Sequence, residues 1–527
     1  MDLVSPDDRQ VGVGVDESRQ HHPSVEVHPG RVGADQHVEI VRRAEANDPS
    51  VADGDGLVDR VAGRERVDRR VGQDEVRGRG HTGRAAGVDK TVRPAGGAND
   101  RRTFARATSR EAMSEGEDDT EAGGLDAAAL AERVRAGDLR LYELAAGAVD
   151  ADAAVAARRA VVGERTETAL DAVGAYGFDA AVAENNIENM LGAVQIPLGV
   201  AGPLPVEGAR TSREAYLPMA TTEGALVASV NRGCAALRAA GGARARVTKS
   251  GMTRAPVFRV ADVAEAEATV EWVRENEDAL REAAESTTNH GELLGVTPYV
   301  VGDSVFLRFR YDTKDAMGMN MATIATEAAC EAVEAETTAD LVALSGNLCT
   351  DKKPAAVNAV EGRGRSVTAD AVLPTAVVEE RLDTTAAAVA EVNRRKNFVG
   401  SAKAASLGFN AHAANVVASV FLATGQDEAQ VVEAANTITT VEPREDGLYV
   451  SVSLASLEVG TVGGGTGLPS QGEALELLGV AGGGDPPGSN ADAFAETIAA
   501  GVLAGELSLL AALSSRHLAS AHASLGR

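Results

Sequence analysis

The amino-acid composition changes sharply near residue 113, and this change decides which part of the chain can build a folded core. Residues 1–112 contain one aromatic residue, Phe104, and one isoleucine, Ile40, among many Arg, Asp, Gly and Val residues. Such a segment cannot bury enough apolar surface to offset the entropy that a chain loses on folding. We therefore expect either a disordered extension or, the interpretation we favour, a spurious segment upstream of a true start at Met113.

The rest of the chain alternates between helix and strand patterns, and 527 residues are enough for two or three domains. Apolar residues at three- and four-residue spacing predict short helices from Leu125 to about Phe178. A Gly- and Pro-rich stretch, Gly192–Val206, predicts a loop and an edge strand. Alternating patterns between Ala255 and about Ala343 predict a compact α+β unit inserted into a larger domain. The chain should end in a long helix from Asp492 to about Ala523, with Asn490 as its N-cap.

The chain is strongly acidic and poor in lysine. Its formal net charge is -27, and it holds seven lysines against 44 arginines. A nucleic-acid-binding protein is usually basic, so the charge argues against that class. An acidic, lysine-poor surface indicates a protein kept soluble at high salt, where ions screen its self-repulsion. A GC-rich genome, which favours Arg, Ala, Gly and Asp codons, would produce the same bias, and both explanations can hold together.

The cysteines and the hydropathy pattern bear on the location of the protein. Cys234, Cys330 and Cys349 are too few and too scattered for a disulfide framework or a zinc site. No metal is therefore predicted, and a cytoplasmic location fits. The sequence has no run of about 18 apolar residues and no apolar N-terminal signal core, so it predicts neither a membrane helix nor a secretory signal.

Two segments hold charged residues suited to acid–base chemistry. In PMATTEGALVASVNRG, Glu223 is either an ordinary acid at a helix start or a carboxylic acid held protonated in an apolar pocket. In SGNLCTDKKPAA, Asp351, Lys352 and Lys353 either form a charged turn or pair a carboxylate with an ammonium that stabilises an oxyanion. Because lysine is scarce in this chain, its placement in this segment favours a function.

Two glycine-containing segments could lie against a flat or phosphorylated ligand. DAMGMNMAT holds Gly318, which would let the backbone approach such a ligand, although methionine-rich segments are more often core. TVGGGTG, from Thr461 to Gly467, follows a strand and could cradle a diphosphate through backbone N–H groups. It lacks the GxGxxG spacing, so a plain glycine loop is the alternative.

Two more residues have an ordinary interpretation beside a functional one. Asp427, in GQDEAQ, is either a helix-start residue or an acid of the site. His522, five residues before the end, is either a solvated histidine or a proton donor.

The order of these motifs resembles that of one enzyme family. PMATTEG, DAMGMNM, SGNLCTDKKPAA, FNAHAAN, GQD and the AGELSLLAALSSRH tail occur in the order and spacing of 3-hydroxy-3-methylglutaryl-CoA (HMG-CoA) reductases. The stretch ENNIENMLGAVQIPLGVAGPL matches the family as well. The resemblance covers about two-thirds of the chain, from about Ala183 to the C-terminus. It is closest to the class I type of eukaryotes and many archaea, in a haloarchaeal-like form.

The resemblance implies that HMG-CoA is reduced to mevalonate and free CoA with two successive hydrides from NADPH. Carried over by motif, Lys352 would stabilise the carbonyl and hemithioacetal oxygen, and Glu223 would donate a proton in the aldehyde step. Asp427 would lie between them and tune both pKa values. His522 would protonate the departing CoA thiolate.

The resemblance also implies three binding regions. The dicarboxylate-like hydroxymethylglutaryl group would be held by Arg254, Ser345, Asp351, Lys353, Lys396 and Asn415. CoA would face Ser229, Asn231 and Arg232. The NADPH (NADP+) site would be lined by Asp315, Gly318, Met319, Gly463, Gly464 and Gly465.

The implied architecture is an α+β multidomain fold. A large substrate-binding domain around a long central helix would comprise residues 183–255 and 344–527. An inserted ferredoxin-like, NADP-binding domain would occupy residues 256–343, and a small helical N-terminal piece residues 113–182. Active sites would form between the subunits of a homodimer or homotetramer, and neither nucleic acid nor a membrane is expected as a partner.

Three departures from the family pattern bear on these expectations. Thr288-Asn289-His290 stands where animal members have Ser-Arg near the adenosine 2′-phosphate, which affects the choice of NADPH over NADH. Asp383 stands where some members have a CoA-facing lysine. The chain stops at Arg527, so neither the phosphorylatable serine nor the membrane anchor of animal members is expected.

Two other functions remain open at this point. One is a CoA-dependent acyl transferase or lyase, which would need no nicotinamide. The other is a non-enzymatic tether through the Arg-rich N-terminus, which the near-zero net charge of that segment disfavours.

Overall fold

The computed structural model describes residues 126–145, 149–209 and 212–515. The chain divides into two units, Met1–Glu111 and Ala112–Arg527, and every described residue belongs to the second unit. The predictions for residues 1–112 and for His522 therefore fall outside the described residues.

The first described elements are helical, as the apolar spacing predicts. Helix α1 (Ala127–Ala136) begins at Asp126, whose carboxylate accepts the backbone N–H of Ala129. Helix α2 (Ala151–Thr166) begins in the same way at Asp150. Three short elements complete the segment: η2 (Glu143–Ala145), α3 (Asp171–Gly174) and η3 (Ala180–Ala183). α1 and α2 enclose a small apolar core, formed by Leu130, Ala131, Val134, Leu144, Ala154, Ala157 and Val161.

Six strands form the sheet of the large core. They are β1 (Leu198–Glu207), β2 (Ser212–Ala220), β3 (Ala243–Arg254), β8 (Arg363–Pro374), β9 (Thr437–Arg444) and β10 (Gly447–Leu457). β1 lies between β2 and β3, and the order continues through β8 and β10 to β9. The prediction of an edge strand at residues 192–206 is therefore wrong, because β1 pairs antiparallel with β2 and, over a short stretch, parallel with β3.

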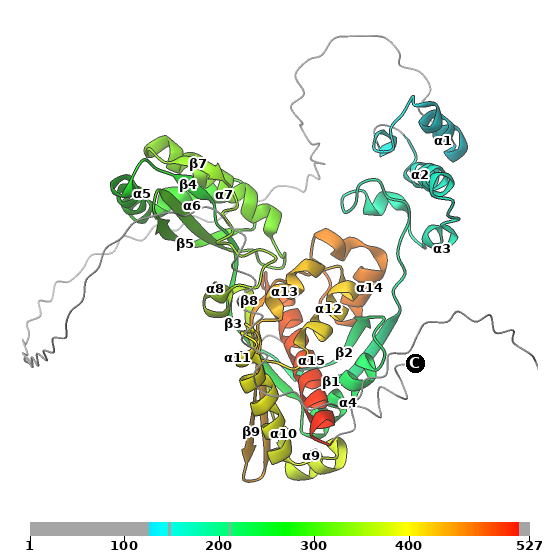
Figure 1. Cartoon of the computed structure of the whole chain (residues 1–527), viewed down its shortest axis with the longest axis vertical. Helices are drawn as coiled ribbons and strands as arrows, with labels where there is room; N and C mark the ends of the chain where they lie inside the picture. Colours follow the sequence, from blue (N-terminus) through cyan, green and yellow to red (C-terminus); the bar gives the residue numbers. More distant parts are fainter. Residues whose placement is uncertain (1–125, 146–148, 210–211, 516–527) are drawn as a thin grey trace, which may run out of the picture. The chain divides into compact units, whose positions relative to one another are not determined.

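One long helix, α15 (Ser489–Ser514), is the centre of the large core (Figure 1). It packs against the sheet and three helices: α4 (Leu226–Ala239), α10 (Ala386–Val392) and α12 (Ala413–Thr424). Its length and hydropathy would suffice to cross a membrane, but 83% of its most apolar window is buried inside the protein. A core helix passes the same test, and the burial accounts for this one without a bilayer.

The start of α15 differs from the sequence prediction. The helix begins at Ser489, with Gly488 as N-cap, so the prediction of Asn490 as N-cap is wrong. The cap comes instead from a distant carboxylate, that of the buried Asp315. It accepts four backbone N–H groups at 2.7–3.1 Å, from Gly484, Gly488, Asn490 and Ala491. These include donors of the first turn, which would otherwise be buried without partners.

A second set of elements, here called the small unit, carries the labels β4, α5, α6, β5, α7 and β7 in Figure 1. It has a hydrophobic core of its own. Its elements are β4 (Val257–Arg259), α5 (Val263–Glu275), α6 (Glu277–Glu285), β5 (Glu292–Val301), β6 (Ser304–Asp312), α7 (Met319–Glu336) and β7 (Asp340–Ala343). β3 joins both sheets, since its last residues, Met252–Arg254, pair with β6. The strand and helix patterns between Ala255 and Ala343 are thus confirmed as elements.

Short elements connect the main ones. These are α8 (Ala356–Glu361), α9 (Thr375–Leu382), the π-helix η4 (Asn393–Gly400), α11 (Ser401–Lys403), η5 (Glu428–Gln430), α13 (Val431–Ala434), η6 (Gly464–Gly467) and α14 (Pro469–Leu477). All three cysteines are buried and unpaired.

The close approach of α4 to α15 leads to a first prediction. A Cβ added at Gly233 would lie 1.9 Å from the backbone oxygen of Ala504, so Gly233→Ala forces the helices apart. We expect a loss of about 1–3 kcal/mol in the free energy of unfolding, measured by urea denaturation.

Gly472 in α14 provides the matched control. A Cβ there meets its nearest atom at 3.6 Å, an ordinary contact. Gly472→Ala should therefore stabilise the protein by about 0.5–1 kcal/mol, because alanine has the higher helix propensity. Equal effects of the two substitutions would contradict the packing argument.

Candidate active site

The loop between β7 and α8 holds three non-glycine residues in the left-handed backbone region. Asn347, Thr350 and Lys352 have φ values of 63°, 60° and 57°. Such conformations persist only where the surroundings hold them, and they are frequent at functional sites. Here Thr350 donates to the carbonyl of Cys349 and to the side-chain oxygen of Asn358, and Thr253 also donates to the carbonyl of Cys349.

Lys352 forms an ion pair with Asp427. Its Nζ lies 2.8 Å from Oδ2 of Asp427, and 46% of the lysine side chain is exposed. The hydrogen bond to Asp427 raises the pKa of Lys352, against a smaller opposing effect of desolvation. The lysine is therefore a full ammonium at neutral pH. The other oxygen of Asp427 accepts the backbone N–H of Ala429 at the start of η5, which fixes the carboxylate.

Glu223 lies in the turn between β2 and α4. Asn415, in α12, donates to its Oε1 at 3.4 Å. The two residues line a cavity of about 170 Å³ with apolar side chains that include Leu226 and Leu422. The carboxylate is exposed rather than enclosed. Within the described residues of one chain it makes no hydrogen bond or ion pair with Lys352 or Asp427. The structure therefore joins Lys352 and Asp427 but does not join Glu223 to them.

The residues predicted to hold the hydroxymethylglutaryl group are dispersed over several elements. Asp351 accepts from Arg363 at 3.0 Å, and Lys353 donates to the carbonyl of Asp351 at 3.1 Å. Arg254 contacts Oγ1 of Thr323 through two nitrogens, at 2.7 and 3.1 Å. Ser345 lies 3.5 Å from the sulfur of Cys349, and Lys396 is exposed on the π-helix η4.

The residues predicted to face CoA lie on α4 and have partners within the protein. Ser229 and Arg232 both bond to Ser508 of α15, with oxygen–oxygen and Nε–oxygen distances of 3.0 and 3.1 Å. Asn231 accepts the backbone N–H of Gly202 at 3.1 Å. These contacts fix α4 against its neighbours, and the predicted contact with CoA stays a prediction.

A cavity of about 570 Å³ brings together both glycine segments and Asp427. One wall is the start of α7, where Gly318 is the N-cap with a φ of 87°. The opposite wall is the loop Gly463–Gly465, where a Cβ at Gly463 or Gly464 would meet no atom within 4 Å. Exposed backbone N–H groups at a helix start and a glycine loop suit a phosphate-bearing ligand.

Asp315 is not among the residues that line this cavity. Its neighbours Ala316 to Met321 line the cavity, whereas its own carboxylate is occupied by the four backbone N–H groups at the start of α15. Asp315 therefore fixes the wall of the cavity, and its predicted part in the cofactor site stays a prediction. Gly318, Met319 and Gly463–Gly465 all line the cavity, and their predicted contact with the nicotinamide cofactor stays a prediction.

A buried charge cluster behind Lys352 was missed by the sequence analysis. Arg363 is fully buried, and its Nη1 lies 3.1 Å from Glu458 and 3.4 Å from Glu433, both also fully buried. Glu433 accepts the backbone N–H of Lys352 at 2.5 Å. Burial raises the pKa of Glu458 to about 8, although Arg363 opposes this. The only signal in the sequence is an isolated charge in an apolar context, as in SLEVG for Glu458.

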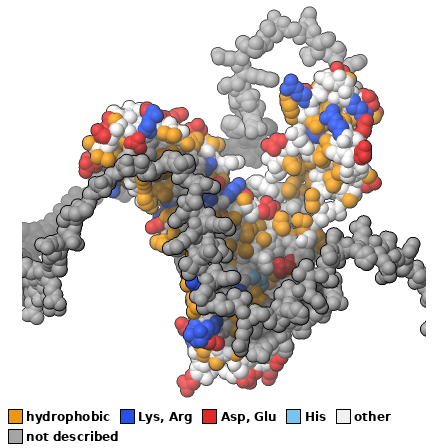
Figure 2. Space-filling model, viewed as in Figure 1, with side chains coloured by type: hydrophobic (Ala, Val, Ile, Leu, Met, Phe, Trp, Pro, Cys, Tyr) orange, Lys and Arg blue, Asp and Glu red, His pale blue; other side chains and the backbone are white. Residues whose placement is uncertain are grey.

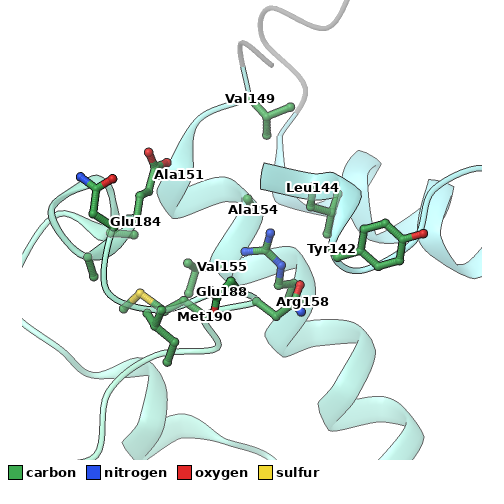
Figure 3. Close-up of a pocket in the computed structure, with 15 residues that line it drawn as sticks. Tyr142, Leu144, Val149, Ala151, Ala154, Val155, Arg158, Glu184, Glu188 and Met190 are labelled. Carbon is green, nitrogen blue, oxygen red and sulfur yellow. The ribbon is translucent and has the colours of Figure 1, made fainter. Parts of the chain in front are cut away.

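A separate cavity of about 350 Å³ lies among the N-terminal helices (Figure 3). Arg158 lies at its centre, with Nε donating to the carbonyl of Leu141 at 2.9 Å. None of the residues predicted to carry function lines this cavity.

The raised pKa of Glu458 predicts how stability depends on pH. The unfolded chain releases this proton near the ordinary glutamate pKa of 4.5, and the folded chain near 8. Between these two pH values the folded state holds a proton that the unfolded state has released. The contribution of Glu458 to the free energy of unfolding therefore falls as pH rises, by at most about 1.4 kcal/mol per pH unit.

Glu458→Gln should remove the part of the slope of unfolding free energy against pH that is due to this group. Urea denaturation of both proteins from pH 5 to 9, in the same salt, gives the difference. Identical slopes for the parent and the variant would contradict the assignment.

Comparisons with known proteins point to one enzyme family. The family model of hydroxymethylglutaryl-coenzyme A reductase matches residues 154–527. The 3-hydroxy-3-methylglutaryl-coenzyme A reductase of Haloferax volcanii is 74% identical over 402 residues, which cover 76% of this chain and 100% of that protein. The enzymes of that name from Halobacterium salinarum and Pyrococcus horikoshii are 71% and 53% identical, over 76% and 77% of this chain and 99% of each.

Solved structures show the same fold. The class II 3-hydroxy-3-methylglutaryl-CoA reductase of Streptococcus pneumoniae, bound to NADPH, superposes with a TM-score of 0.52 at 22% identity. The match covers 63% of this chain and 89% of that one. With the motifs in order, the fold in common and the family model spanning most of the described residues, this chain belongs to the hydroxymethylglutaryl-coenzyme A reductase family.

Proposed function

We propose that the protein reduces (S)-HMG-CoA to mevalonate and free CoA with two hydrides from NADPH, the committed step toward isoprenoids and archaeal lipids. The observation that carries this proposal is the Lys352–Asp427 ion pair, since Asp427 also lines the cavity between the two glycine segments. Membership of the family agrees with it.

The proposed chemistry depends on the charge of Lys352. When a carbonyl carbon accepts hydride, negative charge develops on its oxygen, and a fixed ammonium stabilises that charge. Asp427 keeps Lys352 protonated and limits its positions. Glu223 would donate the proton that the new alkoxide takes up in the aldehyde step. His522, outside the described residues, would protonate the departing CoA thiolate.

The substrate would lie over the loop that holds Lys352. Its carboxylate would be bound by cationic and amide groups nearby: Arg254, Lys353, Lys396 and Asn415, with Ser345 and Asp351 completing the site. CoA would lie along α4, near Ser229, Asn231 and Arg232. Arg254 supports this role because, in the part of the chain that the structure describes, its side chain bonds only the hydroxyl of Thr323, a weaker partner than a carboxylate.

NADPH, which supplies the hydride when bound, would occupy the cavity lined by Gly318, Met319 and Gly463–Gly465. The small unit would be the family's ferredoxin-like cofactor domain. Its strands are all antiparallel in the order β7-β4-β6-β5, with helices after β4 and β6, and this arrangement supports the proposal.

The protein would act as a homodimer or a larger assembly, with active sites between subunits. Two observations support this. Glu223 does not meet Lys352 within the described part of one chain, so a second copy would be needed to bring a proton donor to it. Several large apolar side chains are exposed on the strand pair β1–β2 and on the loop that precedes β1: Val194, Ile196, Leu198, Val200 and Tyr216.

We also infer that the enzyme works at high salt. Acidic side chains are spread over the face seen in Figure 2, on the N-terminal helices as well as on the small unit. Relatives from salt-loving archaea, such as Haloferax volcanii, support the same inference. Activity should rise with KCl concentration; full activity and stability without salt would contradict it.

Two substitutions test the reductase itself. Lys352→Ala removes the oxyanion stabiliser, and Glu223→Gln removes the proton donor. Each should lower the rate of HMG-CoA-dependent oxidation of NADPH at least about 100-fold. The rate is measured from the decrease in NADPH absorbance.

Lys249→Ala is the matched control. This lysine pairs with Glu361 on the surface at 3.2 Å, and its loss should leave turnover within about twofold, because exposed ion pairs contribute little. Undiminished turnover in Lys352→Ala and Glu223→Gln would rule out the assigned roles.

A further inference from the structure

We propose that Glu433 and Glu458 share a single proton beside Arg363, and that this buried pair holds the backbone of Lys352 so that losing the proton releases the lysine and lowers turnover. The inference rests on the proposed reductase function. It makes Glu433, Glu458 and Arg363 positioning residues for Lys352, since none of them lines the cavity that would hold the cofactor.

The arrangement of the carboxylates is the first argument. Both glutamates place an Oε1 atom on the same nitrogen of Arg363, at 3.4 and 3.1 Å. The second oxygen of each is buried and has no partner among the described residues. Two ionised carboxylates beside one cation, with an unpaired buried oxygen on each, would repel strongly in a low dielectric. One proton on the pair removes this repulsion.

The charges around the pair leave no second cation to neutralise it. Arg363 also bonds Asp351 through Nη2 at 3.0 Å, so its single positive charge faces three carboxyl groups. Two other arginines nearby are buried, and neither bonds a glutamate of the pair. Arg308 donates to the carbonyl of Gly362, whereas Arg365 pairs with Asp492 at 2.8 Å and donates to the carbonyl of Val459. The ammonium of Lys352 is directed to Asp427. Within the described residues, protonation is therefore the remaining way to balance the pair.

The contact with Lys352 is the second argument. Glu433 accepts the backbone N–H of Lys352 at 2.5 Å, and that residue is held at a φ of 57°. A left-handed lysine returns to an ordinary conformation unless its peptide groups are tied. Glu433 can accept the N–H of this peptide only while its carboxylate keeps its present position. Repulsion from an ionised Glu458 would displace it, and the ammonium would leave Asp427.

The direction of the pH effect follows from burial. Burial raises the pKa of both glutamates, that of Glu458 to about 8. Below that pH the pair keeps its proton and Lys352 is held; above it the proton passes to solvent and two carboxylates remain. Lys352 itself does not account for a loss of turnover near pH 8, because Asp427 raises its pKa above the ordinary value.

The experiment measures kcat and KM from pH 6 to 10 in the parent enzyme and in neutral isosteres. The parent should lose turnover above about pH 8. Glu458→Gln and Glu433→Gln each remove the shared proton but keep the hydrogen-bonding shape. Both should retain turnover within about threefold at pH 7 and lose the alkaline decline. Glu433→Ala removes the acceptor of the Lys352 N–H and should lower kcat at least tenfold with KM little changed.

Glu496→Gln is the matched control. Glu496 is also fully buried, on α15, and burial raises its pKa. It accepts the backbone N–H of Ala209, and none of its partners among the described residues belongs to the loop that holds Lys352. Its alkaline decline should match that of the parent. If one isostere fails to fold, the other still tests the idea. A decline that persists at the same pH in either folded isostere overturns the proposal.

Infrared spectroscopy separates this proposal from the reductase assignment. A protonated carboxyl band at pH 7 that disappears in Glu458→Gln supports the shared proton whether or not the enzyme reduces HMG-CoA. Absence of that band in the parent overturns the shared proton, even with full reductase activity. A parent enzyme with the band but without HMG-CoA-dependent NADPH oxidation would overturn only the proposed function.

Discussion

The carboxylate of Asp315 is the interaction on which the architecture most depends. Asp315 follows β6 of the small unit in the chain, yet its carboxylate caps α15, the helix at the centre of the large core. Its backbone carbonyl also accepts the N–H of Thr461, at the start of the glycine loop, at 2.8 Å. Three segments far apart in the chain therefore meet at one residue. Both walls of the glycine-lined cavity take their position from this point.

Much of the fold follows from local patterns in the sequence. The helical spacing near the N-terminus, the alternating strands of the small unit and the long final helix all depend on neighbouring residues, and the structure contains them. The edge-strand and N-cap predictions failed because both depend on partners far away in the chain. β1 gains β3 as a neighbour, and α15 gains a cap from Asp315, 175 residues before Asn490.

The candidate site was predictable to the extent that its residues form recognisable motifs. Lys352 and Asp427 were both identified, and the structure pairs them. The support behind them was not identified, because Arg363, Glu433 and Glu458 are single charges in unrelated segments. Only the packing of β8, α13 and the end of β10 turns them into one cluster. Asp315 lies inside a recognisable motif, but the four backbone N–H groups that its carboxylate accepts could not be predicted from that motif.

The continuity of β3 limits how the two cores can move. Residues Arg244–Gly251 pair with β8, and Met252–Arg254 pair with β6 of the small unit, without an intervening linker. A rotation of the small unit must therefore bend this strand or break pairs at one of its ends. Because Arg363 is the first residue of β8, and the next residue, Gly364, pairs with Gly251, strain in the strand would reach the support of Lys352 directly. β3 is therefore a continuous elastic connection that is fixed at both ends, one in each core.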